Sequence, residues 1–234
     1  MNETTYEWKI IEWRTETPTV KTMVLEPVVE KPTFRAGQYV TILLPGHPPV
    51  EGKSYSLSSA PESDEVTITI KKIGTFSSAI IDLPVGATVT TSAPYGFFYP
   101  EPEDEGELVF ISGGVGITPS ASIIDSLTQQ QDQRPIKLFY SNRTASEISF
   151  RERFATLAKQ HDDFTLYYFV TQEPVDDADL HAGRMDGEQI AEKVADLSVA
   201  SFFVCGSVSF VQGMWQSLQE VGVAAHQIYT EGFF

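Results

Sequence analysis

The chain has 234 residues, and its 32 Asp and Glu side chains outnumber its 16 Lys and Arg side chains to give a net charge of −16. Its 41% hydrophobic content is enough for a buried core, which excludes a disordered chain, and its single cysteine excludes an internal disulfide or a multi-cysteine metal site. The negative charge argues against binding to nucleic acid or anionic membranes, because both need clustered Lys and Arg. The sequence has no signal-peptide pattern and no apolar run of the roughly 20 residues that span a bilayer, so we expect a soluble cytoplasmic protein.

The first hundred residues predict a small antiparallel Greek-key β-barrel. Short β-rich runs alternate with Pro and Gly turn residues, and residues 66–70 alternate in polarity as a half-buried strand does. Many short strands separated by turns are typical of barrels and sandwiches. The expected strands are residues 6–13, 20–26, 38–44, 55–59, 66–73 and 87–92.

The pattern changes after residues 100–106, an acidic segment without apolar residues that we expect to be a solvated linker. Beyond it, short apolar runs alternate with amphipathic stretches, which predicts a doubly wound parallel sheet with helices on both faces. The expected strands are 108–112, 136–140, 164–170, 201–205 and 228–231, and the expected helices are 120–130, 150–161, 188–195 and 208–220. We therefore expect two domains, residues 1–102 and residues 103–234.

The most specific local pattern is residues 112–119 (SGGVGITP), which directly follow an apolar run. Glycines at the carboxyl end of a strand let the backbone approach a ligand, and free N–H groups at the start of the next helix favour phosphate. Pro119 suits the first helical turn, where its missing N–H costs nothing. Because the third glycine of the usual dinucleotide fingerprint is absent, a tight turn without a ligand is the alternative.

Weaker patterns lie elsewhere in the chain. Residues 53–59 (KSYSLSS) combine a cation, an aromatic plane and alternating hydroxyl groups, which suits a phosphate joined to a flat ring; ordinary strand residues also explain them. Residues 74–78 offer N–H and hydroxyl donors at a helix start, although a plain N-cap explains them equally well. Taken alone, Cys205 and the two terminal phenylalanines are typical of core packing. The four histidines lack ligand-like spacing, so no metal site is predicted.

In their order along the chain, these patterns resemble the ferredoxin–NADP(H) reductase superfamily, in which a flavin-binding barrel precedes a nicotinamide-binding α/β domain. The family's Arg-x-Tyr-Ser motif is matched by residues 53–56, and its Gly-x-x-Ser-Ser/Thr motif by residues 74–78. Its Gly-Gly-x-Gly-Ile-Thr-Pro motif is matched without a gap by residues 113–119. The resemblance extends from residue 35 to the carboxyl terminus and includes the barrel-exit turn at residues 93–98.

The resemblance implies a role for each residue of the flavin motifs. Tyr55 would stack on one face of the isoalloxazine, and Ser56 would hydrogen-bond near its N5 atom. Lys53 would hold the flavin pyrophosphate together with residues 74–78, but it replaces an arginine and loses the bidentate fork for phosphate. A terminal phenylalanine would cover the other flavin face. The implied FAD-binding residues are Lys53, Ser54, Tyr55, Ser56, Gly74, Ser77, Ser78, Phe233 and Phe234.

For the nicotinamide nucleotide, the resemblance implies that residues 113–118 cradle the pyrophosphate, with Thr118 near the nicotinamide. Cys205 and Glu231 would border the place where the nicotinamide meets the flavin. Hydride transfer needs two rings stacked about 3–3.5 Å apart rather than an acid–base pair. The implied NAD(P)H-binding residues are Gly113, Gly114, Gly116, Thr118, Pro119, Asn142, Arg143, Arg151, Thr171, Cys205 and Gly206. The implied catalytic residues are Ser56, Cys205 and Glu231.

One departure from the family concerns the choice of nucleotide. NADPH-specific members carry a Ser-Arg pair after the strand that here is residues 164–170, whereas this chain has Thr, Gln and Glu at residues 171–173. A 2′-phosphate needs a cation, so we expect NADH, or both nucleotides, to be used rather than NADPH alone. Arg143, Arg151 or Arg184 would compensate if its side chain points into the same pocket.

The resemblance thus implies a FAD-dependent oxidoreductase that takes hydride from NADH or NADPH and passes electrons to a separate acceptor. The acceptors of the family include ferredoxin and flavodoxin, which are acidic and which a chain at −16 repels unless barrel lysines form a local basic patch. Free flavin, a quinone, an artificial dye and a basic redox protein are the alternatives. The alternative function is a non-catalytic flavin or nucleotide sensor, or an electron-transfer subunit of a larger complex. We expect a monomer.

Overall fold

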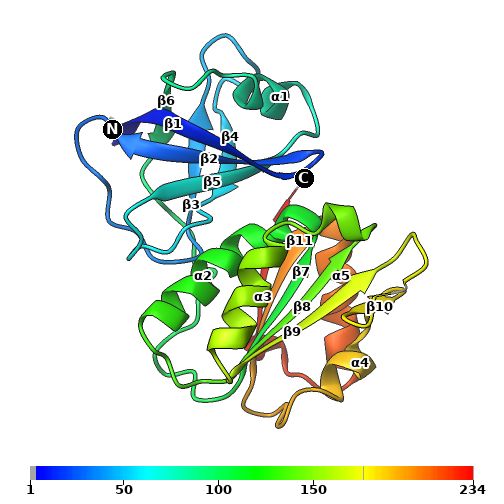
Figure 1. Cartoon of the computed structure of the whole chain (residues 1–234). Coiled ribbons are helices and arrows are strands. Elements are labelled where there is room, and N and C mark those ends of the chain that lie inside the picture. Colours follow the sequence, from blue (N-terminus) through cyan, green and yellow to red (C-terminus); the bar gives the residue numbers. More distant parts are fainter. Residues whose placement is uncertain (1–3, 176, 234) are drawn as a thin grey trace.

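The computed structural model describes residues 4–175 and 177–233. Two lobes are visible, each built on one six-stranded sheet (Figure 1). The first sheet lies before the acidic segment at residues 100–106 and the second lies after it. This arrangement confirms the predicted fold class, while the domain boundary at residue 102 stays a prediction. None of the described helices is long and apolar enough to cross a membrane.

The amino-terminal lobe is an antiparallel barrel. Its sheet has the order β4-β3-β6-β1-β2-β5, and every pairing in it is antiparallel. A bridge between Leu57 and Ile68 joins the two edges. Alternate residues point inward, and Trp8, Ile10 and Met23 are at most 1% exposed in the core. The elements are β1 (Thr5–Thr17), β2 (Val20–Pro27), β3 (Tyr39–Leu43), β4 (Lys53–Ser56), β5 (Val66–Lys71), α1 (Thr75–Ile81) and β6 (Thr88–Ser92).

The second lobe is a parallel sheet with the order β10-β9-β8-β7-β11-β12. Helices α2 and α3 pack on one face, and α4 and α5 pack on the other. The strands are β7 (Leu108–Gly113), β8 (Ile136–Asn142), β9 (Phe164–Val170), β10 (Leu180–Ala182), β11 (Ser201–Ser207) and β12 (Ile228–Phe233). The helices are α2 (Ile117–Gln129), α3 (Arg151–Gln160), α4 (Gly187–Ala191) and α5 (Val208–Glu220), with short 3₁₀ turns η1 (Gly114–Gly116), η2 (Ala145–Glu147) and η3 (Ala225–Gln227).

The carboxyl ends of the central parallel strands point toward the barrel (Figure 1). The η1 turn at the end of β7 packs against β5 of the barrel. The last strand, β12, runs toward the junction of the two lobes (Figure 1). Residues from both lobes therefore meet where ligands usually bind in open α/β sheets, at the carboxyl edge of the strands.

Some local features differ from expectation. The edge strand β10 has only three residues and no apolar run, so its pairing with β9 is not visible as a sequence pattern. Helix α4 ends at Ala191 instead of residue 195. The expected solvated linker is held in place, because Arg134 donates hydrogen bonds to the carbonyls of Glu101 and Asp104, both at 3.0 Å. Arg35 also stacks 3.6 Å from the centre of the Tyr99 ring.

Candidate active site

The glycine turn lies between β7 and α2, as the sequence predicts. Gly114 has a φ of +55°, which favours glycine, and a Cβ atom built there meets no atom within 4 Å. Gly116 is glycine for a different reason, because its Cβ would lie 2.4 Å from the carbonyl oxygen of Cys205. The turn is therefore open on the side of Gly114 and packed against the end of β11 on the side of Gly116.

Thr118 and Pro119 form the buried start of α2. The Thr118 hydroxyl donates a 3.1 Å hydrogen bond to the carbonyl of Val115 and is only 2% exposed. This contact stabilises the turn. Gly113 and Gly206 both leave room for the Phe210 ring, which would lie 3.0 Å or less from a Cβ at either position.

Cys205 lies near the carboxyl end of β11, the strand next to the edge strand β12. Its register partners are Ser112 on β7 and Glu231 on β12. The thiol is fully buried, and burial together with the charge of Glu231 raises its pKa well above the ordinary value. Burial also raises the pKa of Glu231, to about 7. The edge thus presents a protonated thiol beside a carboxyl group that titrates near neutral pH.

Ser56 is the buried residue that ends β4 in the barrel. Tyr39 lies directly opposite it on β3, and burial raises the pKa of Tyr39, with a further contribution from the charge of Glu231. Tyr39 therefore lies within electrostatic reach of the second lobe. The Ser56 side chain is 3% exposed, and its hydroxyl has no hydrogen-bond partner among the described residues. Leaving a buried hydroxyl unpaired costs about 1–3 kcal/mol, which makes the Ser56 hydroxyl a candidate for a contact with a ligand.

The other residues of the first flavin motif lie on β4 with Ser56. Tyr55 is half-buried against the barrel core, and burial raises its pKa to about 12. Lys53 is exposed and forms no ion pair with any residue that the structure describes. The hydroxyl of the neighbouring Ser54, also exposed, is 3.1 Å from the hydroxyl of Thr41.

The second flavin motif forms the turn into α1. The Ser77 hydroxyl accepts hydrogen bonds from the N–H groups of Ile73 (3.0 Å) and Gly74 (3.1 Å). The amide of Ser78 donates to the Gly74 carbonyl at 2.9 Å. The Ser77 hydroxyl therefore serves the turn itself, while Gly74 is exposed, with no atom within 4 Å of a Cβ built there.

The far end of the expected nucleotide site lies at the ends of β8 and β9. The amide of Thr171 donates to the Asn142 carbonyl at 3.1 Å, which brings these two predicted residues together. The Asn142 side chain is buried, with 5% of its surface exposed. Arg143 is exposed. Arg151 instead pairs with Asp177 at 2.6 Å, which offsets its charge.

The carboxyl-terminal phenylalanines are only partly described. Phe233 is half-buried on β12, opposite Ser207, and packs against the core on the α2 and α3 side of the sheet. Phe234 lies outside the described residues. Tyr39, which the sequence patterns did not single out, opens a strand that pairs directly with the Lys53–Ser56 strand.

Comparison with known proteins supports this arrangement. Residues 110–216 match the family model of the oxidoreductase NAD-binding domain. The flavohemoprotein of Bacillus subtilis (strain 168) is 32% identical over 228 residues, which cover 93% of this chain and 56% of that protein. Reductase component 1 of terephthalate 1,2-dioxygenase from Comamonas sp is 30% identical over 210 residues, which cover 88% of this chain and 61% of that protein. The chain thus spans less than two thirds of these relatives.

The fold comparison extends over both lobes. The crystal structure of the flavohem-like FAD/NAD binding domain of nitric oxide dioxygenase from Vibrio cholerae matches with a TM-score of 0.87 and 28% identity. The match covers 97% of this chain and 98% of that chain, so the barrel, the α/β sheet and their order are shared. The NAD-binding family model covers the second lobe and the shared fold covers both lobes, so these findings support the ferredoxin reductase-like superfamily of FAD- and NAD-binding oxidoreductases that the sequence resembles.

Proposed function

We propose that the protein is an NAD(P)H-dependent flavoprotein reductase that binds FAD on the barrel and NADH or NADPH on the α/β domain. The observation that carries this proposal is the Ser56 hydroxyl at the end of β4, which is buried without a partner among the described residues. A flavin ring stacked on Tyr55 would supply the missing acceptor. The residues present therefore fit the cofactor that the family uses.

The two ligands have separate binding elements in this proposal. On the barrel, Lys53 and the exposed turn at Gly74 hold the FAD pyrophosphate, and Tyr55 offers a ring face. On the second lobe, the open side of Gly114 admits the nucleotide pyrophosphate to the backbone N–H groups that begin α2. Phe233 or Phe234 covers the remaining flavin face.

FAD, when bound, supplies a ring that accepts a hydride and releases electrons singly or in pairs. The contribution of the chain is to align the nucleotide with that ring and to exclude water. The Ser56 hydroxyl donates a hydrogen bond to the ring edge. The fully buried Cys205 provides an uncharged, closely packed surface beside the nicotinamide. An ionised Glu231 stabilises the positive charge that the nicotinamide gains as it loses hydride.

This assignment of roles is tested with the variants Glu231→Gln and Cys205→Ala. Because both residues act on geometry and charge at the reacting rings, we expect slower reduction of the flavin by NAD(P)H and nearly unchanged FAD affinity. Stopped-flow absorbance at saturating nucleotide gives the rate, and fluorescence titration of the flavin-free protein gives the affinity. Wild-type reduction rates in both variants would remove Cys205 and Glu231 from the active site.

We further propose that the electrons pass to an acceptor outside the two lobes. The Comamonas relative is by its name a reductase component, and the Bacillus relative is a flavohemoprotein of which the chain spans 56%. This chain has a net charge of −16, so it repels an acidic ferredoxin or flavodoxin at low salt. A neutral or basic acceptor is not repelled. Turnover with a panel of acceptors at low and high salt tests this preference. Faster turnover with acidic ferredoxin as salt falls would contradict it.

A further inference from the structure

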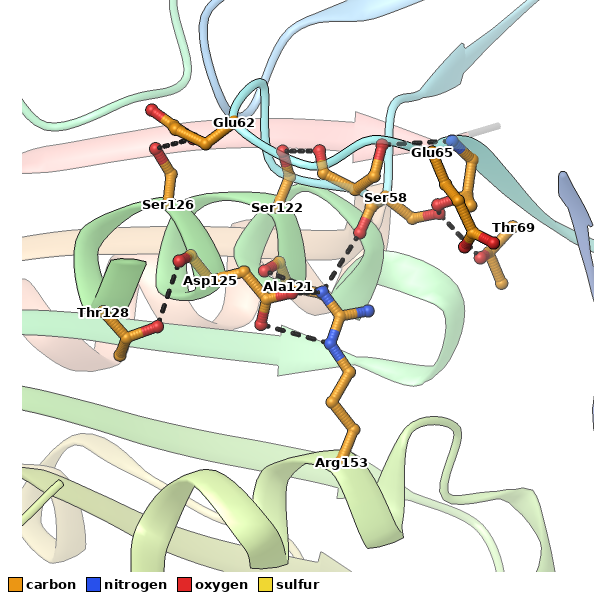
Figure 2. Close-up of polar contacts among 12 residues, drawn as sticks. Ser58, Glu62, Glu65, Thr69, Ala121, Ser122, Asp125, Ser126, Thr128 and Arg153 are labelled. Atoms are coloured by element: carbon orange, nitrogen blue, oxygen red, sulfur yellow. Dashed lines mark hydrogen bonds and ion pairs between the residues drawn. The ribbon is translucent and has the colours of Figure 1, made fainter. Parts of the chain in front are cut away.

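Helix α2 carries a polar stripe that binds the barrel. Ser122, Ser126 and Gln130 follow one another at intervals of four and therefore lie on one face. Ser122 donates to the Ser59 carbonyl at 2.6 Å, and Ser126 donates to Glu62 at 2.9 Å (Figure 2). Gln130 donates to the other Glu62 oxygen at 2.6 Å. The loop between β4 and β5 is thereby fixed to α2.

Arg153 of α3 adds a second connection between the lobes. Its guanidinium forms an ion pair with Asp125 of α2, with a 3.1 Å hydrogen bond from Nε (Figure 2). The same guanidinium donates to the carbonyls of Ser58 and Ala121, both at 3.4 Å. One side chain therefore joins α3, α2 and the barrel segment that follows β4.

The Asp125–Arg153 pair is partly buried beside the barrel, with the two side chains 18% and 29% exposed. Burial raises the pKa of Asp125, and the guanidinium of Arg153 opposes that rise. If α2 and α3 moved apart, each charge would lose its partner and be left uncompensated, which is costly for a buried charge. The ion pair therefore favours the observed positions of α2 and α3. The barrel end of the connection is fixed as well, since the Ser58 hydroxyl is 2.8 Å from that of Thr67 and 2.9 Å from that of Thr69 on β5.

Both ends of this connection lie next to a proposed binding element. Ser58 follows Ser56 by two residues, and α2 begins directly after the glycine turn η1. A displacement of α2 relative to Ser58 would therefore move the nucleotide turn relative to the flavin strand. Hydride transfer is sensitive to such displacement, since a misplacement of about 1 Å can cost roughly 100-fold in rate.

We propose that Arg153, through Asp125 and the Ser58 carbonyl, is a positioning residue that sets the distance between the flavin strand and the nucleotide turn. This inference rests on the proposed reductase function. In this proposal, Arg153 contacts neither FAD nor the nicotinamide nucleotide. Loss of the connection is therefore expected to change the alignment of the two rings and to leave the binding of FAD intact.

The test replaces Arg153 by methionine, which keeps an unbranched side chain but removes the charge and the donors. We expect the rate of flavin reduction at saturating NAD(P)H to fall roughly tenfold or more, with FAD affinity within about twofold of wild type. The long-wavelength charge-transfer absorbance of the nucleotide–flavin complex is expected to weaken. Arg153→Lys keeps the charge and is expected to recover part of both signals.

The matched control is Arg134→Met. Arg134 also forms an ion pair with an aspartate, Asp132, and these side chains are 18% and 19% exposed. That pair holds the segment between the lobes and not the β4–β5 loop. We expect Arg134→Met to lower thermal stability without changing the rate or the charge-transfer band. An equal loss of rate in both variants would reduce Arg153 to a merely structural role and overturn the proposal.

A second readout does not depend on catalysis. Spin labels at Val85→Cys on the barrel and Val199→Cys on the α/β domain report the distance between the lobes, since these sites are 60% and 55% exposed and Cys205 is fully buried. In the FAD-loaded protein, we expect Arg153→Met to broaden or shift the distance distribution and Arg134→Met to leave it unchanged. An unchanged distribution and an unchanged reduction rate in Arg153→Met would contradict the inference.

If Arg153→Met does not fold, Ser122→Ala removes the 2.6 Å bond to the barrel and keeps the ion pair. For Ser122→Ala, a lower rate of flavin reduction together with a shifted label distance supports the proposal. A wild-type rate and a wild-type distance in Ser122→Ala contradict it. Failure of the proposed function has a different signature. In that case the wild-type flavin would not be reduced by NAD(P)H, while the label distances would still respond to Arg153.

Discussion

Cys205 and Glu231 are register partners on the neighbouring parallel strands β11 and β12. Their proximity couples a fully buried thiol to a carboxyl group whose pKa burial raises to about 7. The charge of the same carboxyl group also reaches Tyr39 on the barrel. Glu231 thus lies where the two lobes meet, and its protonation state is sensitive to pH in the physiological range.

The first prediction concerns stability and pH at Glu231. Its folded-state pKa of about 7 lies above the ordinary value of 4.5, so the folded state favours the protonated form. The corresponding stability is present below about pH 4.5 and is lost as the pH rises through about 7. Relative to Glu231→Gln, the wild type is expected to lose on the order of 3 kcal/mol over this range. Urea denaturation of the flavin-free protein across that range measures the difference.

The control for this prediction is Glu192→Gln at an exposed carboxylate after α4. We expect its stability to follow the wild-type pH profile. Parallel profiles for wild type and Glu231→Gln would show that Glu231 does not carry the raised pKa.

The second prediction concerns the open side of the glycine turn. A methyl group at Gly114 meets no protein atom within 4 Å, so Gly114→Ala is expected to obstruct the nucleotide and raise KM for NAD(P)H several-fold. Gly222 has a positive φ of +95° and an equally open environment after α5, and Gly222→Ala carries the same kind of backbone strain. Both variants are expected to lose stability, and only Gly114→Ala to weaken nucleotide use. Equal KM values in the two variants would argue against a nucleotide at Gly114.

The third prediction concerns the strength of FAD binding. Lys53 is exposed, and a lysine offers phosphate a point charge rather than a bidentate fork. Lys53→Arg is therefore expected to tighten FAD by about 1 kcal/mol, or roughly fivefold in Kd. Fluorescence titration of the flavin-free variant gives this value. Lys72→Arg serves as a control, because Lys72 pairs with Asp82. An unchanged Kd in Lys53→Arg would exclude Lys53 as the pyrophosphate ligand.

The fourth prediction concerns the choice between NADH and NADPH. Glu173 accepts a 2.5 Å hydrogen bond from the amide of Ala145, which fixes a carboxylate close to Arg143 and Gln172. Arg151 is paired with Asp177. A 2′-phosphate at Gln172 would meet the Glu173 carboxylate as well as the exposed Arg143, so we expect kcat/KM to favour NADH or to be similar for the two nucleotides. Gln172→Arg is expected to raise the NADPH value by about tenfold to a hundredfold, since a charged contact contributes about 1.5–3 kcal/mol.

Kinetics with both nucleotides test this preference in wild type and in Gln172→Arg. A wild-type preference for NADPH above about tenfold would contradict the assignment. The same conclusion would follow if the ratio of the two kcat/KM values stayed unchanged in the variant.

The fold and the glycine turn could be predicted because their signals are local. Alternating polarity marks the barrel strands, and three glycines after an apolar run mark the turn between β7 and α2. The short edge strand β10 could not be predicted, because its pairing partner and not its own composition determines it. The electrostatic effect of Glu231 on Tyr39 could not be predicted either, because it depends on how the two lobes pack.

The polar connection between the lobes was missed for a related reason. In the sequence, Asp125 and Arg153 are charged residues on amphipathic helices, where such residues are usually solvated. Only the packing of α2 and α3 against the barrel encloses them. The expected linker at residues 100–106 shows the same effect, because Arg134 binds carbonyl groups that sequence patterns do not reveal.

The most direct test of the account is the visible spectrum of the purified protein before and after anaerobic addition of NADH or NADPH. We expect a flavin band near about 450 nm, at one FAD per chain, that bleaches as the nucleotide delivers hydride to the bound ring. A protein that takes up no added FAD, or whose bound flavin neither nucleotide reduces, would contradict the reductase assignment.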